Sequence, residues 1–359
     1  MSSEAPRQLA PVLALVAALA GGYFALTRSP AKSDSLPHLG ARIDQTSVSG
    51  ISSGAYMAGQ FQMAHAKIVT GAAIIAGGPY GCSESVFADA MPGPGGAFIN
   101  LTKAMNGCML NLLGVWGTAN PVDLANKARH RAEKGEIDPI ADVANDRVYL
   151  FSGTSDHTVV EPIVEAAADF YKELGVAPDR IKFVKDLPAG HAFVTDNEGG
   201  ACEASSGPYI VNCHYDQAGE LLHHIYGKLE NRVVTPSGDY LAFDQRPYVG
   251  DFSGHSLDDH GIVYIPPSCR AQSNCKIHVA FHGCAQNRAK VGDAFIKESG
   301  LARWADNNNL IVLFPQIATT GYNPQGCWDW WGYTGQNYLT REAIQIVAVR
   351  RMIDELAQK

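Results

Sequence analysis

A serine flanked by glycines is the first feature of the sequence that could do chemistry. The pentad Gly50-Ile51-Ser52-Ser53-Gly54 follows a short apolar segment and precedes a helix-like run, and the sequence contains no other G-x-S-x-G. This spacing is typical of a sharp turn from a strand into a helix, where glycines leave room for a strained backbone that pushes the serine oxygen into a cleft. Ser52 is therefore the candidate nucleophile, and an ordinary Gly/Ser turn is the alternative interpretation.

A serine hydroxyl is a weak nucleophile, so it needs a histidine base and a carboxylate that orients the histidine. Asp156 lies just past an apolar segment at 147–151 that predicts a strand, and His191 follows the next predicted strand at 181–184. Both occupy glycine-containing loops that should leave the carboxyl edge of a parallel sheet, in the chain order serine, aspartate, histidine. We therefore predict that Ser52, Asp156 and His191 form a catalytic triad.

The remaining titratable residues have simpler explanations. Asp146 is the main rival to Asp156, but it precedes its strand and would lie at the opposite edge of the sheet. The competing histidines adjoin the acid, lie on a predicted helix or lie in a polar region: His157, His223, His224, His255 and His260. A structural or solvent-facing role is the simpler interpretation for each of them.

A serine hydrolase also needs two backbone N–H groups for the oxyanion of its tetrahedral intermediate. The amide of Ser53, directly after the candidate nucleophile, supplies the first. For the second, the turn His282-Gly283-Cys284 follows a predicted strand at 277–281, which makes the Cys284 amide the candidate. In the usual chain order that strand precedes the nucleophile, whereas here it follows about 230 residues later. Either the His-Gly pair is a coincidence or the sheet is circularly permuted, and the strand and helix that follow favour permutation.

The elements that must position these residues alternate along the chain. Apolar segments predict strands at 47–49, 72–76, 147–151, 181–184, 277–281 and 310–314, and apolar residues at helical spacing predict helices near 55–61, 159–176, 217–229, 295–306 and 340–357. Residues 238–267 suggest one or two antiparallel strands, and the Pro/Gly-rich residues 91–96 suggest an inserted loop. This alternation predicts an α/β fold with a mostly parallel sheet and helices on both faces.

The composition narrows the function classes. The chain of 359 residues has 28 Lys+Arg against 36 Asp+Glu, a net charge of −8, which argues against nucleic-acid binding. With 46% hydrophobic and 18% charged residues, the chain is expected to fold. Its eight cysteines include no C-x-x-C, which removes the usual zinc and thioredoxin-like spacings. We therefore expect disulfides, which imply export.

The N-terminus also indicates export. Residues 9–26 form an apolar run that follows Arg7 and contains Ala18-Leu19-Ala20, a sequence that a signal peptidase accepts. Residues 1–26 are therefore predicted to be a signal peptide or an uncleaved signal anchor, since the 18 residues of the apolar run reach the lower limit for a membrane span. Residues 27–40 are predicted to be a linker without a core of its own, and residues 41–359 the catalytic part. A secreted, extracellular or periplasmic location follows from either interpretation.

The sequence resembles the extracellular poly(3-hydroxybutyrate) depolymerases that have a circularly permuted α/β-hydrolase domain, and among them the single-domain fungal members. The resemblance covers nearly the whole chain from Val48. It is carried by segments in the family's order: 47–58 (SVSGISSGAYMA), 76–80 (AGGPY), 152–156 (SGTSD), 190–191 (GH), 208–213 (PYIVNC), 282–284 (HGC) and 323–330 (NPQGCWDW).

The resemblance implies a role for each candidate residue. It makes Ser52, Asp156 and His191 the triad and the amides of Ser53 and Cys284 the oxyanion hole. Trp328 and Asn323 would form part of the wall that holds the polyester. It implies four disulfides between neighbouring cysteines: Cys82–Cys108, Cys202–Cys213, Cys269–Cys275 and Cys284–Cys327. It also implies one catalytic domain that acts as a monomer, with no cofactor and no metal.

The resemblance implies a secreted serine esterase that cleaves poly- or oligo-(3-hydroxybutyrate) through an acyl-enzyme. Two alternatives stay open. One is an esterase of the lipase or feruloyl-esterase kind that acts on other esters. The other is a non-catalytic exported binding protein built on a hydrolase scaffold.

Overall fold

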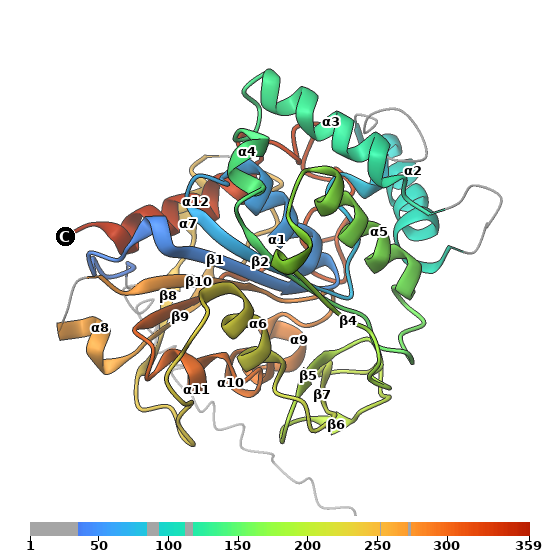
Figure 1. Cartoon of the computed structure of the whole chain (residues 1–359). Helices are drawn as coiled ribbons and strands as arrows, with labels where there is room; N and C mark the ends of the chain where they lie inside the picture. Colours follow the sequence, from blue (N-terminus) through green and yellow to red (C-terminus); the bar gives the residue numbers. More distant parts are fainter. Residues whose placement is uncertain (1–34, 85–92, 112–117, 252, 272–273) are drawn as a thin grey trace, which may run out of the picture. The chain divides into compact units, whose positions relative to one another are not determined.

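A sheet of eight strands runs through the computed structural model, which describes residues 35–84, 93–111, 118–251, 253–271 and 274–359 (Figure 1). The strand order is β4-β3-β2-β1-β10-β11-β9-β8. The bounds are β1 Thr46–Ile51, β2 Val69–Ile75, β3 Arg147–Phe151, β4 Ile181–Val184, β8 Asp239–Asp244, β9 His260–Ile265, β10 Lys276–Phe281 and β11 Leu310–Phe314. Neighbouring strands are parallel along β4, β3, β2, β1, β10 and β11. Strand β9 is antiparallel to both of its neighbours, β11 and β8. The predicted mostly parallel sheet, with an antiparallel pair from residues 238–267, is confirmed.

Helices cover both faces of this sheet, as the alternation predicts. The longer ones are α1 Ser53–Ala64, α2 Gly93–Met105, α3 Pro121–Glu133, α5 Glu161–Glu173, α6 Gln217–Tyr226 and α12 Ile344–Ala357. The shorter ones are α4 Ile140–Val143, α7 Arg246–Val249, α8 Pro267–Ala271, α9 Arg288–Val291, α10 Ala294–Glu298 and α11 Leu301–Ala305. Figure 1 shows α1, α5 and α12 above the sheet and α6, α10 and α11 below it.

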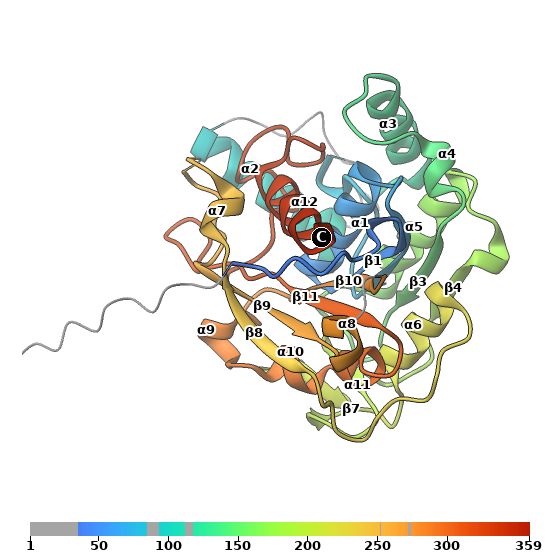
Figure 2. The same ribbon diagram turned by 90° about the vertical axis from the view of Figure 1, so that its left-hand side faces the viewer.

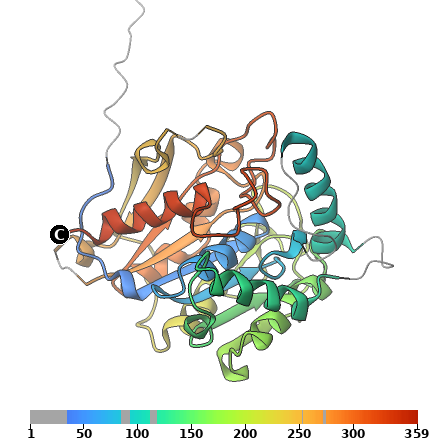
Figure 3. The same ribbon diagram turned by 90° about the horizontal axis from the view of Figure 1, so that it is seen from above.

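Alternating side chains of the strands supply the two cores between these layers. On β2, Ile74 packs in the cluster that contains Phe61 of α1, whereas its neighbour Ile75 packs in the cluster that contains Leu221 of α6. This division follows from the two-residue period of a strand, which sends successive side chains to opposite faces. Helix α12 lies beside α1 on the first face (Figures 2 and 3). Both faces of the central strands are therefore buried.

Strands β1 and β10 are neighbours although about 230 residues separate them in the chain. Their parallel register pairs Gly50 with Phe281. The turn after β1 and the turn after β10 therefore leave the same edge of the sheet, side by side. This is the arrangement that the permutation hypothesis requires.

Three predicted boundaries differ from the structure. Residues 93–96, expected in an inserted loop, begin helix α2, because proline and glycine are tolerated in a first helical turn; residues 91–92 lie outside the described residues. The helix predicted at 295–306 is divided by Gly300, which has a φ of 80°. The last helix begins at Ile344 instead of residue 340, since Ala343 is extended with a ψ of 128°.

Residues 35–40 belong to the folded part, which corrects the end of the predicted linker. Leu36 is 1% exposed. The amide of Leu39 donates to the carbonyl of Leu356 and that of Gly40 to the carbonyl of Gln358. These bonds satisfy carbonyls at the end of α12, which a helix cannot satisfy internally. The predicted signal segment and the rest of the linker lie outside the described residues.

The eight cysteines form the four disulfides that the resemblance implies. The pairs are Cys82–Cys108, Cys202–Cys213, Cys269–Cys275 and Cys284–Cys327. Within the described ranges, none of the helices has both the length and the apolarity needed to cross a bilayer. Over the same ranges, no three metal-ligating side chains gather into a site.

Candidate active site

The turn between β1 and α1 holds Ser52 in a strained backbone conformation. Ser52 has φ 57° and ψ −123°, outside the regions that side chains with a Cβ prefer. Its amide donates to the carbonyl of Ile75 at 2.9 Å. A Cβ at Gly50 would overlap the carbonyl of Gly54, and a Cβ at Gly54 would overlap the carbonyl of Phe281. The two glycines of the pentad are therefore needed sterically, and the turn has the predicted shape.

Asp156 and His191 form a buried pair. His191 Nδ1 lies 2.8 Å from Asp156 Oδ2, and the side chains are 9% and 0% exposed. The other carboxylate oxygen accepts the amides of Thr158 at 2.8 Å and Val159 at 2.9 Å. A carboxylate accepts hydrogen bonds, so Nδ1 is the donor in this contact and Nε2 is left on the other side of the ring as the nitrogen that can accept a proton. The pair thus has the geometry of an oriented general base.

Backbone contacts hold the loops of this pair together. A Cβ at Gly153 would overlap the carbonyl of Ala189, and the Ser155 amide donates to that same carbonyl at 3.1 Å. The His191 amide donates to Ser205 Oγ at 2.8 Å. The glycine in the Asp156 loop thus permits the close approach on which the pair depends.

The parallel register aligns the ends of four strands at the edge where these residues lie. Ile51 pairs with Ile75, Ile75 with Phe151, and Phe151 with Val184. Ser52, Asp156 and His191 follow the ends of β1, β3 and β4, so all three leave this one edge. Within the described residues the Ser52 hydroxyl makes no hydrogen bond, and it is half-buried. Hydrogen bonds of catalytic groups are often long before a substrate binds.

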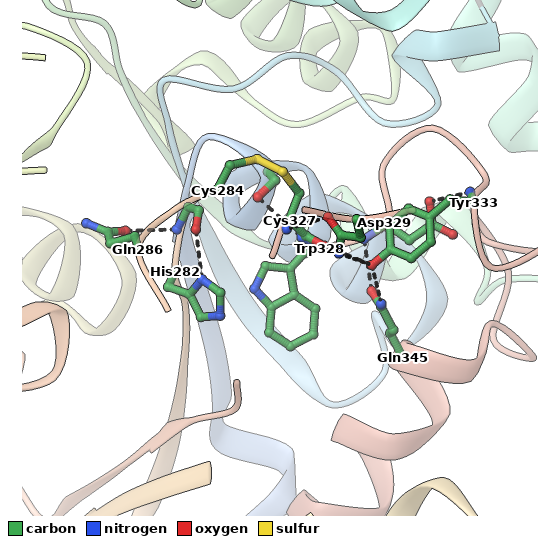
Figure 4. The surroundings of a disulfide bond; sticks show 11 residues. His282, Cys284, Gln286, Cys327, Trp328, Asp329, Tyr333 and Gln345 are labelled. Atoms are coloured by element: carbon green, nitrogen blue, oxygen red, sulfur yellow. Dashed lines mark hydrogen bonds between the residues drawn. A yellow bond between two sulfur atoms is a disulfide. The ribbon is translucent and has the colours of Figure 1, made fainter. Parts of the chain in front are cut away.

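The turn after β10 lies against Ser52. A Cβ at Gly283 would lie 3.4 Å from the Cβ of Ser52. The Gly283 carbonyl accepts His282 Nδ1 at 2.8 Å, and the Cys284 amide has no acceptor among the residues that the structure describes. Cys284 is bonded to Cys327, and the amide of the next residue donates to the carbonyl of Gln325 at 2.6 Å (Figure 4). This turn can therefore present a free amide next to the serine.

His282 has a structural role in that turn. Burial lowers its pKa to about 4, so the ring stays neutral near pH 7. Its Nε2 accepts the amide of Ile317 at 3.1 Å, which leaves the proton on Nδ1 for the Gly283 carbonyl. The histidine therefore fixes the turn without titrating.

Trp328 and Asn323, which the resemblance places in the wall that holds the polyester, are both buried in the structure. Trp328 lies next to the Cys284–Cys327 disulfide (Figure 4). It is 0% exposed and packs edge-on against Phe281, with ring centroids 4.9 Å apart. Asn323 is 1% exposed, and its amide group bonds both the N–H and the carbonyl of Cys327. Both side chains shape the segment behind the disulfide instead.

Sequence reasoning missed Asp329 and Gln286. The carboxylate of Asp329 accepts the amides of Trp331, Gly332, Tyr333 and Thr334 and the hydroxyl of Thr334. A short acidic side chain ahead of Gly332 and Thr334 is a signal for such a turn, since aspartate caps nearby backbone amides. Gln286 gives no comparable signal, because two of its partners, Pro208 and Tyr209, are distant in sequence.

A second serine–histidine arrangement lies in the core. His278 on β10 contacts Ser47 Oγ at 2.6 Å and Ser49 Oγ at 2.8 Å, and all three are fully buried. Burial lowers the pKa of His278 to about 3. Without a carboxylate partner or access to solvent, this group lacks the parts of a triad. Asp146, the rival acid, is 4% exposed, precedes β3 and bonds Gln62 instead of a histidine.

A parallel α/β sheet with a serine turn and an aspartate–histidine pair at one edge defines the class of serine hydrolases. No protein-family model matches the chain. Two curated relatives do: a polyhydroxybutyrate depolymerase of Talaromyces funiculosus, 32% identical over 92% of this chain and 95% of the relative, and a poly(3-hydroxybutyrate) depolymerase of Delftia acidovorans, 37% identical over 90% of this chain. The chain spans 61% of the length of the Delftia protein.

Solved structures agree with these relatives. The crystal structure of the PHB depolymerase from Penicillium funiculosum superposes with a TM-score of 0.78 at 30% identity, over 91% of this chain and all of that chain. A serine-to-alanine variant of a PHB depolymerase, complexed with an R3HB trimer, superposes equally well. The chain belongs to the polyhydroxybutyrate depolymerase family, whose members are ester hydrolases.

Proposed function

We propose that this chain hydrolyses the ester bonds of poly- or oligo-(3-hydroxybutyrate). The observation that carries the proposal is the buried Asp156–His191 pair at the sheet edge where the strained Ser52 turn ends. Membership of the family supports an ester substrate. The trimer in the complex of the related structure supports an oligoester of 3-hydroxybutyrate.

In the proposed mechanism, Ser52 Oγ attacks the ester carbonyl while His191 Nε2 takes its proton. Asp156 holds the ring in the required tautomer and stabilises the imidazolium. The amides of Ser53 and Cys284 donate to the oxyanion. His191 returns the proton to the leaving alkoxide, and an acyl-enzyme forms on Ser52. A water molecule activated by His191 then releases the hydroxy acid and restores the serine.

The same proposal covers the chain order and the location of the protein. We infer a circular permutation from the position of β10 beside β1, since β10 carries the oxyanion turn. We also infer export to the outside of the cell or the periplasm, which the four disulfides support. We expect a monomer, with membrane attachment only if residues 9–26 remain uncleaved.

The proposal is tested with the variant Ser52→Ala and a fluorophosphonate probe. Wild-type protein should be labelled and should release 3-hydroxybutyrate from a soluble trimer, and Ser52→Ala should do neither while its circular dichroism is unchanged. Ser47→Ala is the matched control, because it removes the serine of the buried Ser47–His278 contact. Labelling that persists in Ser52→Ala would refute the assignment of the nucleophile.

Assays on different esters separate the remaining alternatives. Wild-type protein that cleaves acyl nitrophenols and leaves both the trimer and polyhydroxybutyrate granules intact would be an esterase for other substrates. Wild-type protein that is not labelled at all would be a non-catalytic binding protein.

A further inference from the structure

Gln286 bridges two loops that flank the site. Its side chain is 2% exposed. Its Oε1 accepts the amide of Gly283 at 2.8 Å. Its Nε2 donates to the carbonyls of Pro208 at 3.2 Å and Tyr209 at 3.1 Å. Only this orientation of the amide group matches a donor on one side and two acceptors on the other, so both ends of the glutamine are in use.

On the first side, the Gln286 side chain holds the Gly283 N–H, one residue before the Cys284 amide, and the Gly283 carbonyl is held by two other groups. The backbone N–H of Gln286 donates to the carbonyl of Gly283 at 3.2 Å, and His282 Nδ1 donates to the same oxygen. In a planar trans peptide the carbonyl and the following N–H point in opposite directions. Holding the Gly283 carbonyl therefore fixes the direction of the Cys284 N–H, in a turn whose Gly283 lies against Ser52.

On the second side, Gln286 reaches the loop that supports the histidine. The Tyr209 carbonyl that accepts from Gln286 also accepts the amide of Phe193 at 2.9 Å. Phe193 begins strand β5 (Phe193–Thr195) two residues after His191, and β5 pairs with β7 (Ile210–Asn212). One buried side chain thus connects the oxyanion turn after β10 with the segment that follows the general base.

We propose that Gln286 is a positioning residue that sets the Cys284 amide relative to Ser52 and His191. The inference rests on the proposed function of those residues. Gln286 touches no reacting atom in this scheme. Its effect is on the transition state, because the oxyanion forms only there and a displaced amide loses most of its hydrogen bond to it.

The test compares Gln286→Leu with the wild type on soluble 3-hydroxybutyrate trimer. We expect kcat to fall by about 10- to 100-fold, because displacing an oxyanion donor should cost part of what removing it costs. KM should stay within about threefold of the wild-type value. Inactivation by a fluorophosphonate should slow in parallel, because its phosphoryl oxygen occupies the same hole. Binding of the trimer is measured by calorimetry in Ser52→Ala and in the double variant Ser52→Ala with Gln286→Leu. The two affinities should be equal if Gln286 acts only on the transition state, whereas a merely structural role does not require them to be equal.

Gln62→Leu is the matched control. Gln62 is a fully buried glutamine whose oxygen accepts from Tyr171 Oη and whose nitrogen donates to Asp146, away from the site. It should lose thermal stability but keep kcat. Gln286→Glu keeps an acceptor for Gly283 and loses the donor to Pro208 and Tyr209, so it should also lower kcat, and it decides the question if Gln286→Leu does not fold.

Three results would overturn the inference. The first is a folded Gln286→Leu or Gln286→Glu variant with kcat within threefold of the wild type. The second is a fall in kcat for Gln62→Leu equal to that for Gln286→Leu. The third is a fall in trimer affinity as large as the fall in kcat/KM. Failure of the proposed function would be seen separately, as wild-type protein with neither turnover nor labelling.

Discussion

A Cβ added to Gly54 would overlap the carbonyl oxygen of Phe281, so the first turn of α1 lies directly against the end of β10. This close approach joins the turn that carries Ser52 to the turn that carries Cys284. It also explains the second glycine of the pentad by the packing of α1 against β10, a strand distant in sequence, in addition to the strain of the turn itself.

Gly54→Ala should therefore separate the two turns. We expect a loss of about 1 to 3 kcal/mol in the free energy of unfolding from overpacking, and a fall in kcat of at least tenfold. Chemical denaturation and trimer hydrolysis measure the two effects. Gly200→Ala is the control, since a Cβ there meets nothing within 4 Å. Equal behaviour of the two variants would contradict the close contact.

Asp156→Asn should lower kcat by about 10³-fold or more, because an amide can hold the ring in the wrong tautomer and cannot stabilise the imidazolium. The two backbone amides that Asp156 accepts keep the loop in place, so KM and the melting temperature should change little. Steady-state kinetics on the trimer measure the loss. A variant with more than a tenth of wild-type kcat would exclude Asp156 as the orienting acid.

Asp146→Asn should instead change how stability depends on pH. Burial raises the pKa of Asp146 to about 8 from the ordinary 3.8, so the folded state holds the proton more tightly than the unfolded chain. What Asp146 contributes to the free energy of unfolding is therefore fully present below about pH 4. This contribution is lost as the pH rises to about 8, and the free energy of unfolding falls by at most about 1.4 kcal/mol for each pH unit.

Asparagine at this position can still accept from Gln62 and does not titrate, so the variant should gain stability relative to wild type between pH 4 and 8. Urea denaturation at pH 4, 6 and 8 measures the difference. A constant difference across the three pH values would contradict the buried, proton-binding carboxylate. Activity should be unaffected, because Asp146 lies at the other edge of the sheet from Ser52.

Removing the Cys284–Cys327 bond should affect both stability and catalysis. The cysteines are 43 residues apart, so Cys284→Ser with Cys327→Ser should cost about 4 kcal/mol by loop-closure entropy. The turn that carries the Cys284 amide also loses an anchor, so kcat should fall with it. Calorimetry and trimer hydrolysis check the two effects.

The bond between Cys269 and Cys275 supplies the comparison. It closes a loop of 6 residues, so its removal should cost about 2 kcal/mol. It lies before β10, at the opposite end of that strand from the oxyanion turn, so kcat should stay near wild type. If kcat falls in proportion to the loss of stability in both double variants, the Cys284–Cys327 bond has no separate effect on catalysis.

The local geometry around the candidate residues could be predicted from spacing in the sequence. The Ser52 turn follows from two glycines at fixed distances, and Asp156 and His191 each follow a strand that the apolar pattern indicates. The parallel sheet then brings these loops to one edge, so their proximity could be predicted before their coordinates were known.

The sequence does not show which side chains are buried in the core and which line a cleft. Trp328 is an aromatic residue near the site, but its ring packs inward against Phe281, and nothing in the local pattern distinguishes a ring in the core from one in a cleft. Gln286 was missed for the same reason. Its partners at positions 208 and 209 become neighbours only when the chain has folded.

The adjacency of β1 and β10 has a consequence for how the protein acquires its structure. During synthesis β1 emerges early, but the neighbour on one side of it emerges only about 230 residues later. The centre of the sheet therefore cannot close until most of the chain is available, and such long-range pairing slows folding. This delay fits the proposed export, because slow pairing of β1 with β10 would keep the chain unfolded while it crosses a membrane.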